Sequence, residues 1–333
     1  MPRPASRRLG EFELIARYFA PLSRGHPGAW GLLDDVATIA PSPGCELVVK
    51  TDAVVAGVHF FADDPPDLVA KKALRVNLSD LAAKGARPLV YLLDLILPDS
   101  IDEAWIAGFA RGLEADQAEY GIHLVGGDTD KTPGPATIAV MALGEIALGR
   151  TIRRGGARPG DNIFVTGTIG DAALGLFALR GDLPDLSPGA AGFLGARYRL
   201  PQPRVALGPR LVGIATAGLD VSDGLVADLR HLCEVCGLAA EVGAARVPLS
   251  PAAREAIGAK PELFAAALSG GDDYEILFTA PKSAAANLAR LAAETGVPIT
   301  AIGEMVAAPE PAVTVRDERG RMLPLAAEGW THF

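Results

Sequence analysis

Strand-like and helix-like patterns alternate along this chain, and no other feature constrains its fold as strongly. Apolar runs typical of strands occur at 46–55, 89–97, 122–125 and 136–146, and helical spacing of apolar residues occurs at 67–84 and 102–120. An earlier stretch, 10–22, also has apolar residues at helical spacing. Because strands that alternate with helices pack in layers, we predict an α/β (α+β) fold.

A segment rich in Gly, Arg and Pro interrupts the pattern at 149–160 and predicts a surface connector. The pattern then restarts, with strands expected at 162–166, before Asp220, and at 275–279, 299–302 and 312–315, and with helices expected at 171–179, 204–217, through His231 and at 283–295. The Gly- and Pro-rich stretch 181–195 predicts a mobile excursion. Since 333 residues exceed one small domain, we predict two domains, 1–149 and 150–333.

Charge and composition exclude several classes of protein. Forty acidic against 31 basic side chains give a net charge of −9, which disfavours binding to nucleic acid and to anionic membranes. The uncharged run 132–144 is shorter than the roughly 20 residues that span a bilayer, and Glu11 and Glu13 interrupt any secretory signal. Three cysteines are too few for a disulfide scaffold. We expect a cytoplasmic protein.

The standard nucleotide-binding loops are absent from the sequence. No Lys follows a Gly and no G-x-G occurs, which excludes the Walker loop and the dinucleotide fingerprint. The five His residues are scattered, and Cys233 and Cys236 form a single C-x-x-C, so a zinc site has little support. We expect these two cysteines to pack in the interior.

Aspartates recur where predicted strands end. Four apolar segments run into small residues and Asp, ending at Asp52, Asp128, Asp223 and 272–273, and a fifth segment places an Asp pair at 34–35 before an apolar run. Carboxylates at strand ends line the crevice where α/β sheets bind ligands, and hard oxygen ligands suit Mg²⁺ together with substrate phosphates. For any one segment, an ordinary turn rich in Asp and Gly remains the alternative.

A further acidic residue, Asp80, shares one helical face with Asn77 and Lys84. A solvated Asp–Lys pair is one interpretation of this face. A buried polar pair that faces the metal-binding crevice is the other, because the surrounding positions are apolar.

Seven segments in order resemble the thiamine-monophosphate kinase family, and they cover 10–17, 34–35, 51–60, 76–83, 126–129, 221–225 and 268–275. The resemblance extends to the terminal residues 329–333. The family belongs to the aminoimidazole-ribonucleotide-synthetase superfamily, whose members bind ATP without a Walker loop. The resemblance therefore implies that superfamily's two-domain architecture, with ATP and Mg²⁺ bound by the first domain.

Carried over by position, the resemblance implies three sets of site residues. The Mg²⁺ ligands would be Asp35, Thr51, Asp52, Asp80, Asp128, Asp220 and Asp223. ATP would contact Gly127, Asp128, Arg154 and Ser222, and the second substrate would contact His59, Asp272 and Trp330. Simpler roles stay open for three of these residues, since His59 could be a strand-end residue, Arg154 a solvated charge and Trp330 a packing anchor.

The implied reaction is ATP-dependent phosphorylation of thiamine monophosphate to thiamine diphosphate by direct in-line transfer. Mg²⁺ would neutralise the repulsion between ATP and the acceptor phosphate. That phosphate, with a second pKa of about 6, is already largely a dianion, so we expect no catalytic base and no covalent nucleophile. The resemblance also implies a homodimer that acts in thiamine diphosphate biosynthesis.

Three departures from the family pattern affect expected site residues. The segment 31–33 reads Gly-Leu-Leu where the family has Gly-x-Gly, Lys50 replaces a small hydroxyl residue, and Asp272 stands where Glu is common. Aminoimidazole-ribonucleotide synthetase, which shares the ATP and Mg²⁺ site, is the alternative enzyme. A regulator that binds ATP and Mg²⁺ without forming product is the alternative outside catalysis.

Overall fold

The computed structural model describes residues 10–324, and the chain divides into two compact units. Of the described residues, the first unit contains 10–78 and Arg87–Glu145, and the second contains Ser79–Ala86 and 146–324. The domain boundary expected at 149/150 stays a prediction. The two units differ from it by the placement of Ser79–Ala86 and by a change of unit at Glu145/Ile146.

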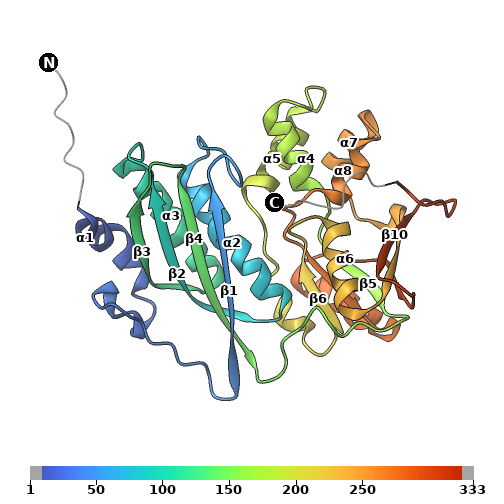
Figure 1. Ribbon diagram of the computed structural model, residues 1–333, viewed down its shortest axis with the longest axis horizontal. Helices are drawn as coiled ribbons and strands as arrows, with labels where there is room; N and C mark the ends of the chain where they lie inside the picture. The colour runs from blue at the N-terminus through green and yellow to red at the C-terminus, as the bar shows by residue number, and fades with distance from the viewer. Residues whose placement is uncertain (1–9, 325–333) are drawn as a thin grey trace. The chain divides into compact units, whose positions relative to one another are not determined.

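The first unit is built on a sheet whose strand order is β1-β4-β2-β3 (Figure 1). Its elements are β1 (Cys45–Val55), α2 (Pro66–Ala83), β2 (Arg87–Leu97), α3 (Glu103–Tyr120), β3 (His123–Lys131) and β4 (Thr137–Ala147). β2 pairs parallel with β3 and antiparallel with β4. The edge strands of this sheet, β1 and β3, are therefore separated by two strands.

The two faces of this sheet differ in burial. Along β2, Tyr91, Leu93 and Leu95 are buried, and they alternate with the more accessible Leu92 and with the exposed Asp94. Successive side chains of a strand point to opposite faces, so one face belongs to the core and the other is partly open. Figure 1 shows α2 and α3 on the same side of the sheet.

Helices α2 and α3 approach each other closely. A Cβ on Gly112 of α3 would lie 2.4 Å from the backbone oxygen of Asp67 in α2, so this contact requires glycine. Beside it, the Arg75 guanidinium makes two hydrogen bonds of 2.7 and 2.8 Å to the buried Asp116 carboxylate. A bidentate pair of this kind fixes the register of the two helices as well as their contact.

The predicted helix at 10–22 is broken into short pieces. The α-helical turn α1 (Glu11–Leu14) continues into a π-helical turn, Ile15–Phe19, and a 3₁₀ turn, Ala20–Ser23. A further 3₁₀ segment, Pro27–Leu32, follows. Pro21 and Pro27 lie in the first turns of the two 3₁₀ segments, where a missing N–H costs little.

The second unit is built on a mixed sheet of order β10-β7-β9-β5-β8-β6. Its strands are β5 (Asn162–Thr166), β6 (Ala217–Asp220), β7 (Ala239–Gly243), β8 (Ile276–Ala280), β9 (Ile299–Val306) and β10 (Ala312–Arg316). Its helices are α4 (Asp171–Arg180), α5 (Pro188–Arg199), α6 (Leu225–Cys236), α7 (Pro251–Ala259), α8 (Leu263–Ser269) and α9 (Ala285–Thr295).

Both faces of the central strands in this sheet are covered. In β5, Ile163 and Val165 belong to one apolar cluster and Phe164 to another, and Phe278 of β8 stacks on Phe164 with ring centroids 5.3 Å apart. Alternate residues of one strand in two clusters mean a core on each side. Each such side chain contributes about 1.5–3 kcal/mol through burial.

Two predictions about the second half are wrong. The stretch 181–195, expected to be a mobile excursion, enters α5, because Ser187 accepts the N–H of Ala190 as an N-cap and Pro188 suits the first helical position. The helix expected at 204–217 is replaced by an irregular segment with one 3₁₀ turn, Gly208–Leu211. Gly208 lies against the backbone of Ala82, where no side chain would fit.

Two further findings concern the cysteines and the membrane. Cys233 is buried, as expected, whereas Cys236 is half-buried and its thiol donates to the carbonyl oxygen of Arg154.

Within residues 10–324, no helix combines the length and the apolar character needed to cross a bilayer.

Candidate active site

In the second unit, three predicted site residues lie at the turn between β6 and α6. Asp220 is the last residue of β6, and Ser222 and Asp223 follow before α6 begins at Leu225. The turn depends on Gly224, which has φ +117°, and a Cβ there would lie 2.5 Å from the carbonyl oxygen of Ser269. The structure therefore brings these three residues together through a turn that only glycine can complete.

Asp228 holds this turn from inside the helix. Its Oδ2 atom accepts hydrogen bonds from the N–H groups of Ser222, Asp223 and Gly224 at 3.0, 3.0 and 3.2 Å, and its side chain is 1% exposed. N–H groups at the start of a helix commonly bind phosphate. Here the Asp228 carboxylate already accepts the hydrogen bonds of these N–H groups. A ligand at this turn would therefore meet the side chains of Ser222 and Asp223.

The charge balance around Asp228 relates Arg154 to this turn. Burial, followed by the negative charge of Asp223, raises the pKa of Asp228 to about 7, and the positive charge of Arg154 opposes that rise. Sequence reasoning missed Asp228, because an acidic residue in the first turn of a helix is common for its favourable dipole interaction alone. Its role depends on three backbone groups that no motif displays.

The connector runs beside β6. The N–H of Gly218 donates to the carbonyl oxygen of Arg153 at 2.9 Å, and the N–H of Ile152 donates to that of Lys84 at 3.1 Å. Arg154, which follows, is an exposed residue. The expected contact of Arg154 with ATP stays a prediction.

The segment 270–275 packs against the same turn. The N–H groups of Asp272 and Tyr274 donate to the carbonyl oxygens of Ser222 and Val221, both at 2.8 Å. A Cβ on Gly271 would lie 2.1 Å from the carbonyl oxygen of Ser222, which explains the glycine before the acidic pair. The structure therefore places the expected substrate residue, Asp272, directly beside the expected nucleotide residue, Ser222.

Asp80 also belongs to the second unit. It lies in the last turns of α2 and is half-buried, and its neighbour Ser79 donates its hydroxyl to the carbonyl oxygen of Tyr274 at 3.4 Å. Asn77, predicted to share its face, is fully buried, and its amide donates to the carbonyl oxygen of Ala73 within the helix. Asp80 thus approaches the 270–275 segment through the adjacent serine.

In the first unit, His59 follows β1 and is fixed by two contacts. Its Nδ1 atom accepts the N–H of Val55 at 3.1 Å, and its carbonyl oxygen accepts the ammonium group of the buried Lys72 at 2.7 Å. Because Nδ1 is an acceptor, the proton of the neutral ring resides on Nε2. The contact of His59 with the second substrate stays a prediction.

Gly127 and Asp128 lie on the edge strand β3. Gly127 has φ +148°, and a Cβ there would lie 1.9 Å from the carbonyl oxygen of Leu93, so its backbone can approach β2 only as glycine. Asp128 is exposed, its Oδ1 atom accepts the N–H of Thr129, and its register partner in β2 is Asp94. The pairing of β2 with β3, which sets Asp94 beside Asp128, is not visible in the sequence.

The remaining expected ligands of the first unit are spread out. Thr51 is exposed and Asp52 half-buried on the edge strand β1, and Asp35 is exposed in the loop before that strand. Across residues 10–324, no three Asp, Glu, His or Cys side chains lie close enough together to hold a metal ion. Trp330 lies outside the described residues. The ligand set stays a prediction.

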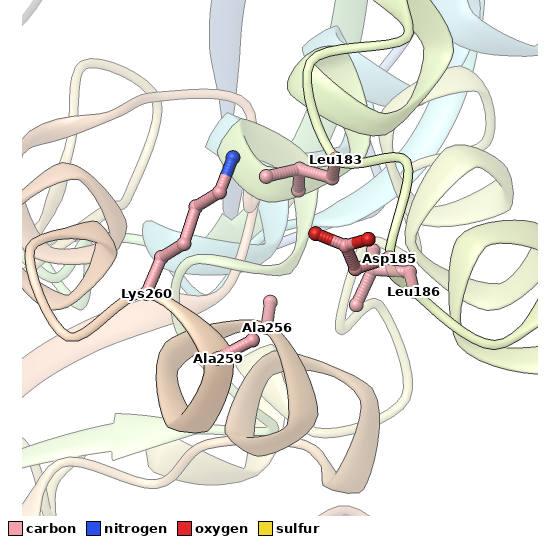
Figure 2. Close-up of a pocket in the computed structure, with 6 residues that line it drawn as sticks. All are labelled: Leu183, Asp185, Leu186, Ala256, Ala259 and Lys260. Carbon is pink, nitrogen blue, oxygen red and sulfur yellow. The ribbon is translucent and has the colours of Figure 1, made fainter.

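A pocket in the second unit contains none of these residues. Figure 2 shows it between the segment after α4 and helix α7, and its lining residues are Leu183, Asp185, Leu186, Ala256, Ala259 and Lys260. The Lys260 ammonium donates to the carbonyl oxygen of Asp182, and this contact links the end of α7 to the loop.

Comparisons with known proteins match the chain over most of its length. The family model described as AIR synthase related protein, N-terminal domain, matches residues 33–146, and the corresponding C-terminal domain matches residues 158–316. A thiamine-monophosphate kinase from Caulobacter vibrioides is 44% identical over 332 residues, which are 99% of this chain and 92% of the relative.

Solved structures agree with this assignment. The crystal structure of thiamine-monophosphate kinase from Stenotrophomonas maltophilia K279a has a TM-score of 0.78 and 40% identity, and the match covers 85% of this chain and 89% of that one. The structure of AaThiL complexed with AMPPCP and TMP has a TM-score of 0.75 and 30% identity, with 92% and 97% covered. The expected fold class is confirmed. The chain therefore belongs to the thiamine-monophosphate kinase family, within the AIR synthase related proteins.

Proposed function

We propose that this chain is an ATP-dependent kinase that converts thiamine monophosphate to thiamine diphosphate. The observation that carries this function is the 44% identity to a thiamine-monophosphate kinase over 99% of the chain. A structural relative was solved with AMPPCP, an analogue of ATP, and TMP, which supports a site for two phosphorylated ligands. The AIR synthase and regulator alternatives have no comparable support.

The chain's own residues would bind and orient the two substrates. Ser222, on the turn held by Asp228, and Gly127, which is exposed on the edge strand β3, would contact ATP. Arg154 would pair with phosphate oxygens, as a guanidinium does in a charge-assisted contact. Asp272 would meet thiamine monophosphate beside Ser222, and His59 is the further contact expected for this substrate.

No residue is proposed as a general base. The acceptor is a phosphate whose second pKa of about 6 leaves it largely dianionic near neutral pH, so no proton has to be removed before attack. Transfer then depends on alignment and on compensation of negative charge. Trp330, which lies outside the described residues, would offer its ring to the flat cationic thiazolium.

The donor chemistry of the expected metal ligands fits Mg²⁺. Every candidate offers oxygen: carboxylates at Asp35, Asp52, Asp80, Asp128, Asp220 and Asp223, and a hydroxyl at Thr51. The ammonium group of Lys50 lies 3.1 Å from the Asp52 carboxylate, so a positive charge of the chain already pairs with this expected ligand. When bound, Mg²⁺ supplies charge neutralisation between ATP and the acceptor phosphate.

We also propose that the enzyme is a homodimer in the cytoplasm. The face of the first sheet that carries Leu92 also carries its register partner Met141, which is 42% exposed, and Val49 of β1 is 59% exposed. Apolar side chains on an open sheet face are typical of surfaces that another chain covers. Light scattering tests this proposal: the wild type should have twice the chain mass, and Met141→Glu should shift it toward the monomer.

One product assay tests the kinase function. The protein is incubated with ATP, Mg²⁺ and thiamine monophosphate, and the products are separated; thiamine diphosphate should form in a 1:1 ratio with ADP. Asp52→Asn and Asp128→Asn should abolish turnover and leave the circular dichroism spectrum unchanged. Absence of thiamine diphosphate at high enzyme concentration would refute the function, and full activity of either variant would refute the metal assignment.

A further inference from the structure

The segment that carries Asp272 has an unusual backbone. Asp272 has φ +72° and Tyr274 has φ +51°, so two non-glycine residues flanking Asp273 lie in the left-handed region. Such conformations are costly for residues with a Cβ and persist only where the surroundings enforce them. The left-handed conformations of Asp272 and Tyr274, on either side of the buried Asp273, therefore require specific contacts that stabilise them.

Asp273 provides the first set of contacts. Its side chain is 1% exposed, and its two carboxylate oxygens accept the N–H groups of Gly170 at 2.6 Å and Ala172 at 3.2 Å. Both donors lie at the start of α4, where Gly170 has φ +85° and a Cβ would lie 2.4 Å from Ala267. The Asp273 carboxylate is therefore bonded to a turn that is itself closely packed.

Glu275, two residues further along the chain, makes a second set of buried contacts. The buried Glu275 carboxylate accepts hydrogen bonds from the Thr166 hydroxyl at 2.7 Å and from Arg197 at 2.9 Å, and it also contacts Arg204. Asp273 and Glu275 therefore both point into the interior. The side chains between and before them, Tyr274 and Asp272, are half-buried.

A side-chain hydrogen bond joins the two left-handed residues. The Tyr274 hydroxyl lies 3.2 Å from Oδ1 of Asp272 and donates to it. The two backbone N–H groups are already bonded to Val221 and Ser222, so the backbone does not move to accommodate a different side-chain direction. The hydroxyl therefore restrains the direction in which the Asp272 carboxylate faces.

We propose that Asp273 and Tyr274 are positioning residues for Asp272: Asp273 holds the strained backbone and Tyr274 orients the carboxylate toward the second substrate. This inference rests on the proposed function, in which Asp272 contacts thiamine monophosphate. Neither residue needs to touch the substrate, since both act through Asp272. Because the segment is bonded to Ser222, the same contacts hold the nucleotide and acceptor sides of the site in one register.

Tyr274→Phe tests the orienting hydroxyl. This variant should raise KM for thiamine monophosphate by about tenfold or more, the effect of losing one hydrogen bond to a charged group, and leave kcat and KM for ATP unchanged. Tyr18→Phe is the matched control, since Tyr18 also donates its hydroxyl to a carboxylate, that of Glu103, in the first unit. The control should leave both KM values unchanged.

Asp273→Asn tests the anchor. An amide has one accepting oxygen instead of two, so one of the two N–H groups of α4 loses its partner, and KM for thiamine monophosphate should rise by more than in Tyr274→Phe. Calorimetric binding of thiamine monophosphate without ATP gives a readout independent of turnover, and it should weaken in parallel. Thermal unfolding identifies a variant that fails to fold, in which case Tyr274→Phe alone decides.

Two outcomes separate this inference from the function on which it rests. If the wild type forms no thiamine diphosphate, the proposed function fails. The positioning role fails, while the function stands, if the wild type is active and both variants retain wild-type KM and binding for thiamine monophosphate. It also fails if the variants lower kcat and raise the KM values for both substrates to the same extent.

Discussion

The Lys50 ammonium lies 3.1 Å from Oδ2 of Asp52, two positions along the same strand. Residues i and i+2 of a strand share a face, so β1 itself brings this cation to the carboxylate that is predicted to hold metal. Lys50 stands where the family pattern has a small hydroxyl residue. The ion pair therefore places a fixed positive charge where a mobile divalent cation is expected.

Lys50→Ser should tighten Mg²⁺ binding by about tenfold, because a competing charge a few ångströms away is removed from a partly exposed site. Calorimetric titration of Mg²⁺ into the protein with AMPPCP present measures this affinity. Lys282→Ser is the control, since it removes the same charge from the Lys282–Glu304 ion pair elsewhere. Unchanged or weaker Mg²⁺ binding in Lys50→Ser would contradict this role.

Asp228→Ala should destabilise the fold and weaken ATP binding together. The substitution leaves three N–H groups of the β6–α6 turn without their acceptor, and we expect a loss of about 2–4 kcal/mol in the free energy of unfolding. Asp228→Asn keeps an accepting oxygen and should lose less than half of this. Urea denaturation and nucleotide titration measure the two effects, and equal losses in both variants would show that charge, and not the acceptor, holds the turn.

The sequence predicted most features that lie within a single strand or helix. Asp220 at the end of β6 and the buried Cys233 in α6 follow from local patterns, because apolar runs and turn residues determine where elements end. Helix α5 was missed, since Gly and Pro at 188–195 obscure its periodicity and its stability comes from packing of Leu194 and Tyr198. Tertiary burial overrides weak helix propensity there.

The sequence did not predict how strands, helices and loops pair with one another. The order β1-β4-β2-β3 places Asp52 and Asp128 on opposite edge strands, roughly 14 Å apart at the usual strand spacing, which no run of residues reveals. The pairing of 270–275 with the β6–α6 turn likewise joins residues about fifty positions apart through backbone hydrogen bonds. Residue types alone led to the predicted site chemistry, whereas the long-range contacts that bring residues such as Asp272 and Ser222 together required the structure.

Gly127→Ala should destabilise the protein by about 3 kcal/mol or more, because the new methyl group meets the Leu93 carbonyl oxygen at 1.9 Å. Gly121→Ala provides the matched control. Gly121 also has a positive φ, +66°, but a Cβ there meets nothing within 4 Å, so only the backbone cost of about 1–2 kcal/mol remains. Chemical denaturation of both variants isolates the clash, and equal losses would show that β3 can shift away from β2.

Glu145→Gln should remove part of the protein's acid sensitivity. The backbone N–H of Ser42, followed by the Arg87 guanidinium, lowers the pKa of Glu145 in the folded chain. A carboxyl whose folded pKa is depressed stabilises the fold above its unfolded pKa of about 4.3, and this stability is lost as the pH falls through the folded pKa. At pH 7 the variant should therefore be less stable than wild type, and the difference should shrink below about pH 4. Denaturation across pH 3–7 checks this, with the exposed Glu318→Gln as a control of equal charge. A stability difference that stays constant with pH would show that the Glu145 contacts do not depend on its ionisation.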